Sequence, residues 1–172
     1  MRQAIWILVM VAGVGGIVTS TTSRQRNADS NSSIPGIETP SGYRDWKLIS
    51  VAHEEGKLND IRAILGDELA VKTYREGKLP FPDGAIIARL AWNYVSSDEN
   101  NKIFGRQQSF IAGAPTNFQF MVKDSSKYAT TGGWGFAQFV EGKPDKKADL
   151  STCFGCHEPV KARDFVFTRY AR

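Results

Sequence analysis

The sequence predicts an α+β domain built mainly from an antiparallel β-sheet, with a few short helices. Apolar and polar side chains alternate in several short segments, which is the pattern of strands with one buried face. The connections between these segments are short, as suits antiparallel neighbours. One segment also carries the start and stop signals of a helix. The first two observations favour a sheet over a helical bundle, and the third adds a short helix to that sheet.

The first half of the domain is expected to contain two strands and then a helix. Alternation predicts strands over 46–51 and 60–65. Asp67 is a suitable N-cap for a helix over 67–76, because its carboxylate can accept from a free backbone N–H of the first turn. Gly77 can adopt the left-handed conformation that ends such a helix.

The second half is expected to supply most of the remaining sheet. Asp-Gly at 83–84 predicts a turn into the apolar, aromatic run 85–94, which has the composition of a central strand. Further strands are predicted over 104–112, 117–122 and 134–139.

Shorter elements are expected near the C-terminus. A short helix over 124–129 would end at the glycine pair 132–133. Ser151 is a candidate cap for a helical turn that follows it. Residues 164–170, Asp-Phe-Val-Phe-Thr-Arg-Tyr, predict a last strand that closes the structure.

The N-terminal residues have the form of a secretory signal. Arg2 precedes the apolar run 4–18, and a Ser/Thr-rich stretch follows. We assign 1–23 to a signal peptide, with an uncleaved membrane anchor as the alternative, and expect export to the periplasm or an equivalent compartment. Residues 24–41 are polar and predict a flexible linker. Residues 42–172 remain for one domain with a single core.

The charge pattern excludes one class of partner. The formal net charge is +4, but no basic stripe runs along the sequence, so nucleic acid is not expected. Three lysines shortly before the segment 153–157 form either a solvated loop or a patch that guides an acidic redox partner protein: Lys143, Lys146 and Lys147.

The pentapeptide 153–157, Cys-Phe-Gly-Cys-His, uses both cysteines of the chain and one of its two histidines. It has the form of a c-type haem attachment site, in which Cys153 and Cys156 bond the haem vinyl groups and His157 binds the iron. A redox dithiol, a disulfide and half a zinc site are the alternatives. Zinc would need a further ligand, and only His53 is left among the histidines. We therefore predict one covalently attached c-type haem.

Five segments resemble the cytochrome P-460 family and its cytochrome c′-beta relatives, over about 41–172. The resemblance implies a homodimeric, mainly antiparallel β protein whose five-coordinate c-type haem is open opposite His157. It also implies either oxidation of hydroxylamine to nitrous or nitric oxide, or binding of small gases such as nitric oxide. The segments are 42–46 (Gly-Tyr-Arg-Asp-Trp), 83–84 (Asp-Gly), 132–136 (Gly-Gly-Trp-Gly-Phe), 153–157 and 164–170 (Asp-Phe-Val-Phe-Thr-Arg-Tyr).

Arg89 departs from the pattern that this resemblance implies. In the hydroxylamine-oxidising members, a lysine on the strand after Asp-Gly is bonded covalently to a haem meso carbon, and Arg89 stands at that spacing. A guanidinium stays charged and delocalised, so it is a poor nucleophile for such a bond. Arg89 could instead pair with a haem propionate or donate a hydrogen bond in the distal pocket, or it could be a structural arginine at the sheet edge.

The sixth position of the iron separates ligand binding from electron transfer. His53 is either a distal ligand or part of a solvated turn, and Met121 is either a thioether ligand or a core residue. An open position favours a protein that binds nitric oxide or a related ligand. Hydroxylamine oxidation is the second hypothesis, with Glu141 and Asp145 as candidate proton acceptors or plain loop residues. A six-coordinate electron carrier is the third.

Overall fold

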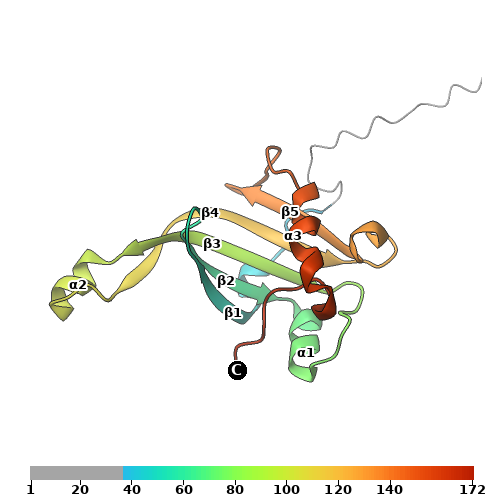
Figure 1. Ribbon diagram of the computed structural model, residues 1–172, viewed down its shortest axis with the longest axis horizontal. Helices are drawn as coiled ribbons and strands as arrows, with labels where there is room; N and C mark the ends of the chain where they lie inside the picture. Colours follow the sequence, from blue (N-terminus) through green and yellow to red (C-terminus); the bar gives the residue numbers. More distant parts are fainter. Residues whose placement is uncertain (1–36) are drawn as a thin grey trace, which may run out of the picture.

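The computed structural model describes residues 37–172 and contains a six-stranded antiparallel sheet with three α-helices (Figure 1). The sheet order is β1-β2-β3-β4-β5-β6, so every strand pairs with its neighbours in the sequence. The predicted α+β class is confirmed. The signal peptide 1–23 and most of the linker lie outside the described residues. The strands are β1 (Lys47–Glu54), β2 (Asp60–Gly66), β3 (Ile86–Ser96), β4 (Phe110–Lys123), β5 (Trp134–Val140) and β6 (Lys143–Pro144).

Alternation along the strands gives the sheet two different faces, each with its own apolar cluster. The first face packs against α1 (Glu68–Glu76) and α3 (Ser151–His157), as Figure 1 shows. Its cluster includes Ile64, Ile87 and Phe136. The opposite face carries Leu65, Ala88, Phe120 and Phe139, among others, and is covered by Ile37 and Tyr43. The helices, and with them the haem-type pentapeptide, therefore lie over the first face.

Helix α1 forms where its capping residues predict it. The Asp67 side chain accepts a hydrogen bond of 2.8 Å from the backbone N–H of Ala70. Gly77 ends the helix in the left-handed conformation, with φ of 63°. The buried residues Ala70 and Val71 attach the helix to the first face of the sheet. The prediction for this helix is confirmed at both ends.

The connection from β3 to β4 differs from the predicted one. Residues 98–104 form helix α2 (Asp98–Phe104), and the strand predicted from 104 begins only at Phe110. Ser97 caps α2 by accepting from the backbone N–H of Asn100, and Gly105 ends it. The two strands predicted over 104–112 and 117–122 belong to one long strand, β4. Strands β3 and β4 with α2 at their tip form an arm that projects from the body (Figure 1).

Three predictions near the C-terminus are wrong. A turn and a short 3-10 segment, η2 (Ala129–Thr131), replace the helix predicted over 124–129. The side chain of Ser151 does not cap α3, because it donates to the carboxylate of Asp149. The predicted strand 164–170 does not form, because φ of Asp164 is 52° and that of Phe165 is 63°, values that turn the chain away from an extended path.

Candidate functional site

Helix α3 presents the pentapeptide against the first face of the sheet. Cys153 is half-buried beside the apolar cluster of that face, whereas Cys156 is exposed, and both are free thiols. Burial raises the pKa of the Cys153 thiol, and the neighbouring Cys156 and Asp149 raise it further. The two thiols stand one helical turn apart, as attachment to two vinyl groups of one porphyrin requires.

His157 ends α3 with its ring fixed by a backbone carbonyl. The Nδ1 atom lies 2.6 Å from the carbonyl oxygen of Phe165. Since that oxygen can only accept, Nδ1 carries the hydrogen and Nε2 keeps its lone pair in the neutral ring. Burial lowers the pKa of His157, so the ring stays neutral, although the bond to Phe165 partly opposes this. The rings of Phe136 and Phe167 each lie 5.1 Å from the imidazole, centroid to centroid.

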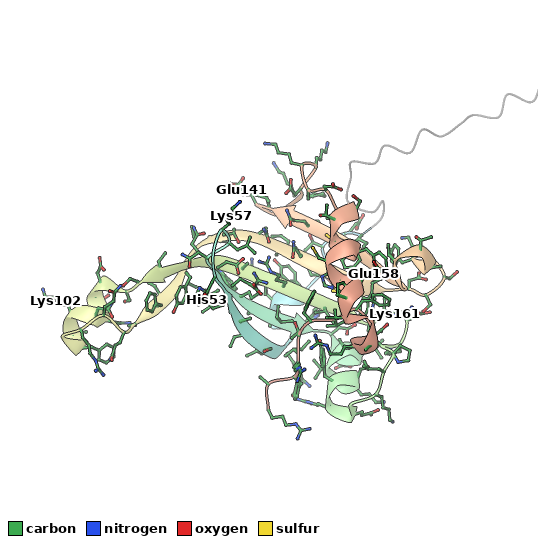
Figure 2. All side chains as sticks on the ribbon, in the orientation of Figure 1. His53, Lys57, Lys102, Glu141, Glu158 and Lys161 are labelled. Atoms are coloured by element: carbon green, nitrogen blue, oxygen red, sulfur yellow. The ribbon has the colours of Figure 1, made fainter. Side chains whose placement is uncertain are left out.

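These donors fit a haem better than a zinc ion. Within residues 37–172, no group of three or more His, Cys, Asp or Glu side chains is arranged to hold a metal ion. His53 lies away from α3 (Figure 2), with its Nε2 3.4 Å from Asn59 Oδ1 and its ring 4.0 Å from that of Tyr94. The residues that remain are two thiols and one imidazole with a free Nε2, which is the set that a c-type haem uses.

A row of polar side chains crosses the same face of the sheet. In register, Arg89 of β3 lies opposite Gln119 of β4, and Gln119 lies opposite Gln138 of β5. The amide of Gln119 donates to that of Gln138 at 2.6 Å, and Gln138 donates to Asp145 at 2.8 Å. The next row along the same strands contains Ile87, Met121 and Phe136, and the ring of Phe136 contacts His157. The polar row therefore lies next to the row that supports His157.

Arg89 is held in this row by an anion and two amides. Its guanidinium donates to Asp60, to Asn117 at 2.7 Å and to Gln119 at 3.4 Å. The side chain is only 16% exposed, and burial, followed by the nearby charge of Arg62, lowers the pKa of Arg89. Its ordinary pKa is so high that it remains a cation at neutral pH.

Asp60 joins two arginines and is itself almost completely buried. Its side chain is 4% exposed and accepts from Arg62 at 2.6 and 2.9 Å, as well as from Arg89. Sequence reasoning did not single out Asp60, Gln119 or Gln138. The available signal was that charged and amide residues occupy alternate positions of strands whose other positions are apolar.

The remaining predicted site residues are divided between this face and the periphery. Met121 lies on the sheet face that α3 covers and packs against the apolar cluster there. Asp145 joins the polar row through Gln138. The hydrogen bond from Gln138, and then that from Lys147, lowers the pKa of Asp145, so it is a carboxylate at neutral pH. Glu141 is exposed in the turn after β5, with φ of 52°.

Comparison with known proteins identifies the family. No curated protein matches this chain. A family model described as cytochrome P460 matches residues 40–168, a range that contains all six strands and the pentapeptide on α3. Membership of this family implies haem, in agreement with Cys153, Cys156 and His157. The match covers well over half of the sequence, and the chain therefore belongs to the cytochrome P460 family.

Proposed function

We propose that this protein carries one c-type haem on Cys153, Cys156 and His157 and binds nitric oxide or a related nitrogen-oxide ligand at the open side of the iron. Such a haem supplies an iron that can bind a small ligand and change its oxidation state. The observation that carries the proposal is the placement of a permanent cation, Arg89, within a hydrogen-bonded row on the face that α3 covers.

Arg89 can act on a polar ligand because its orientation is already fixed. Asp60 and Asn117 hold two of its nitrogens, while a guanidinium has five N–H donors in all. Donors held in place by other groups cost little to orient when charge develops on a ligand. We expect Arg89 to stabilise a bound anion or the negative end of a polar diatomic, or else to pair with a haem propionate.

Hydroxylamine oxidation is the second candidate function, and Asp145 is the observation that favours it. The polar row begins at Arg89 and ends at this carboxylate, which is unprotonated at neutral pH and could accept a proton released by a substrate. Arg89 argues against hydroxylamine oxidation, since the resemblance implies that hydroxylamine-oxidising members have a cross-linking lysine at this position.

The absorption spectrum of the purified protein tests both functions. We expect the dithionite-reduced protein to give an ordinary high-spin c-type spectrum that changes when nitric oxide or carbon monoxide is added, and Arg89→Leu to weaken nitric oxide binding. A strongly red-shifted Soret band in the reduced state would instead indicate a cross-linked haem and favour hydroxylamine oxidation.

The electron-carrier hypothesis is tested by the two remaining candidate ligands. It requires a low-spin iron bound by His53 or Met121 and no binding of added gas. We expect the spectrum to be unmoved in His53→Ala, because that histidine interacts with Asn59 and Tyr94 instead. Met121→Ala is the more demanding test, since this side chain lies on the same face of the sheet as the pentapeptide. A change from low spin to high spin in either variant would support the carrier function.

We also propose a homodimer, which the projecting arm supports. Several apolar side chains of the arm are exposed, which is typical of an interaction surface. They are Val95, Ile103, Phe104, Phe110 and Ile111. Light scattering after size exclusion should give twice the monomer mass, and replacement of both Ile103 and Phe104 by aspartate should give monomers. A monomeric parent protein would contradict the proposal.

We also propose that the protein is exported to the periplasm or an equivalent compartment, because residues 1–23 have the form of a secretory signal. Among the described residues, no helix has the length and apolar character needed to cross a membrane. Fractionation of cells, with N-terminal sequencing of the mature chain, tests export and cleavage.

A redox partner protein is a separate proposal. Three exposed lysines lie around β6, where an acidic partner could approach: Lys143, Lys146 and Lys147. If such a partner exists, electron transfer should slow with rising salt.

A further inference from the structure

A buried ion pair lies on the same face of the sheet as α3, on the other side of His157 from Arg89. The Nζ atom of Lys123 is 2.7 Å from Oδ1 and 3.0 Å from Oδ2 of Asp164. The two side chains are only 4% and 8% exposed. Lys123 ends β4, and Asp164 directly follows η3 (Glu158–Arg163), the 3-10 segment after α3. The pair thus ties the sheet to the chain just beyond the pentapeptide.

Both residues of the pair make further polar contacts. Lys123 also donates to the carbonyl of Gly132 at 3.1 Å, and its Nζ lies 5.0 Å from the ring centroid of Trp134. The carboxylate of Asp164 accepts from the backbone N–H of Phe81 at 2.9 Å. The backbone carbonyl of Asp164 accepts from the indole N–H of Trp134 at 2.8 Å. A buried ion pair offers little net stability over apolar packing, but such a network allows only one arrangement of the groups it joins.

The network fixes an unfavourable backbone conformation at two consecutive residues. Asp164 and Phe165 have φ of 52° and 63°, which non-glycine residues adopt only where their surroundings hold them. The ring of Phe165 packs on Gly132, where an added Cβ would overlap it. With the backbone and ring both held, the carbonyl of Phe165 points at Nδ1 of His157, 2.6 Å away.

We propose that Lys123 and Asp164 are positioning residues for His157. By holding the Phe165 carbonyl in place, they select the imidazole tautomer with Nδ1 protonated and aim its Nε2 lone pair at the iron. This inference rests on the proposed role of His157 as the axial ligand. It assigns a function to two charged residues outside the pentapeptide, namely Lys123 at the end of β4 and Asp164 directly after η3.

The strength of the Nδ1–H···O=C bond sets how good a ligand Nε2 is. A strong bond draws the Nδ1 proton toward the carbonyl and raises the basicity of the ring, which strengthens its bond to iron. A more basic axial imidazole also stabilises the oxidised iron. Loss of the ion pair should therefore weaken the iron–histidine bond and raise the reduction potential, even where the protein stays folded.

The test compares folded variants in the haem-loaded protein. Asp164→Asn keeps an oxygen acceptor for Phe81, and asparagine tolerates the left-handed conformation, so it removes mainly the charge. Lys123→Met removes the cation and keeps most of the length of the side chain. Phe120→Leu is the matched control, because it lowers stability from the opposite face of the same strand. If both single variants fail to fold, the double variant Lys123→Leu with Asp164→Asn leaves no unpaired buried charge.

A pyridine haemochrome first establishes that each protein carries a c-type haem, and resonance Raman spectra of the reduced proteins then give the iron–histidine stretching band. We expect that band to move to lower frequency, and the reduction potential to rise, in the variants of the pair but not in Phe120→Leu. An unmoved band and potential in folded variants would overturn the inference and leave the pair as structural only. A parent protein with no haemochrome would overturn the proposed function instead.

Discussion

Two ionic groups on one face of the sheet differ in how completely they are enclosed. Asp60 with Arg62 and Arg89 forms a group whose arginine side chains keep 14% and 16% of their exposure. Lys123 with Asp164 forms a pair in which neither side chain exceeds 8%. The first group contains two cations and one buried anion, and its second anion, Glu54, is half-exposed and pairs with Arg62. The second is balanced, and its donors point at fixed acceptors of the protein.

This difference separates a group that can respond to a ligand from one that holds the framework. Arg89 has N–H donors in excess of its partners, as a residue that meets a small anion needs. Lys123 uses its ammonium on Asp164 and Gly132 and faces the ring of Trp134. Mutations of the Asp60 group should therefore change ligand binding more than stability. Mutations of the Lys123–Asp164 pair should change stability more than ligand binding.

The largest effect is expected when the enclosed pair is broken. Lys123→Ala leaves the Asp164 carboxylate buried without its cation, which costs about 3–5 kcal/mol in the free energy of unfolding. Urea denaturation followed by tryptophan fluorescence measures it. A loss below about 1 kcal/mol would place this pair with exposed salt bridges and remove the contrast with Arg89.

A smaller loss is expected from Gly132→Ala, which disturbs the enclosed pair without changing its charges. The added Cβ overlaps the Phe165 ring, and φ at this position is +67°. The expected loss is about 2–4 kcal/mol, from overlap together with backbone strain. Gly142→Ala is the control, since φ there is +77° with open space around the Cβ. Equal losses in the two variants, measured by thermal unfolding, would show that the overlap is relieved at no cost.

Asp60→Asn should change ligand binding more than it changes stability. Loss of this anion removes charge-assisted hydrogen bonds at a cost of about 1–3 kcal/mol, because both arginines retain some access to water. Arg89 then loses its anchor, so the affinity of the reduced protein for nitric oxide should fall. Stopped-flow binding measures this. Unchanged ligand affinity in a destabilised variant would mean that the arginine group is structural, like the lysine pair.

Arg62→Gln should have the smallest effect of the four. Asp60 keeps its bond to Arg89 in this variant, and the second partner of Arg62, Glu54, is half-exposed. We expect a loss of about 0.5–1.5 kcal/mol in unfolding free energy. Nitric oxide binding should change little relative to Asp60→Asn. A greater loss of binding than in Asp60→Asn would shift the functional role from Arg89 to Arg62.

Local patterns predicted much of this fold from the sequence. Alternation located the core of β1, β2 and β5, and the apolar run 85–94 located β3. The caps Asp67 and Gly77 defined α1. These signals act between residues close in the chain. Helix α2 was missed since Phe104 was grouped with the apolar residues of the next strand. A strand was also predicted over 164–170, but distant contacts hold Asp164 and Phe165 in positive φ.

The candidate site divides in the same way. The spacing of Cys153, Cys156 and His157 is a local signal, and the family match agrees with it. The polar row depends on which residues of β3, β4 and β5 face one another, which is fixed by the register of the whole sheet. The pairing of Asp60 with Arg89 and the role of Lys123 therefore could not be predicted from the sequence alone.

The sequential order of the sheet bears on how the protein is assembled. Each strand pairs with the one before it, so pairing can follow the chain as it arrives from its N-terminal side, without waiting for distant partners. Both cysteines come after the last strand, and the segment beyond them contributes to β1 the bond from the Ala171 N–H to the carbonyl of Ile49. The chain on both sides of the two thiols is thus fixed to the sheet, through β6 before them and through this bond after them.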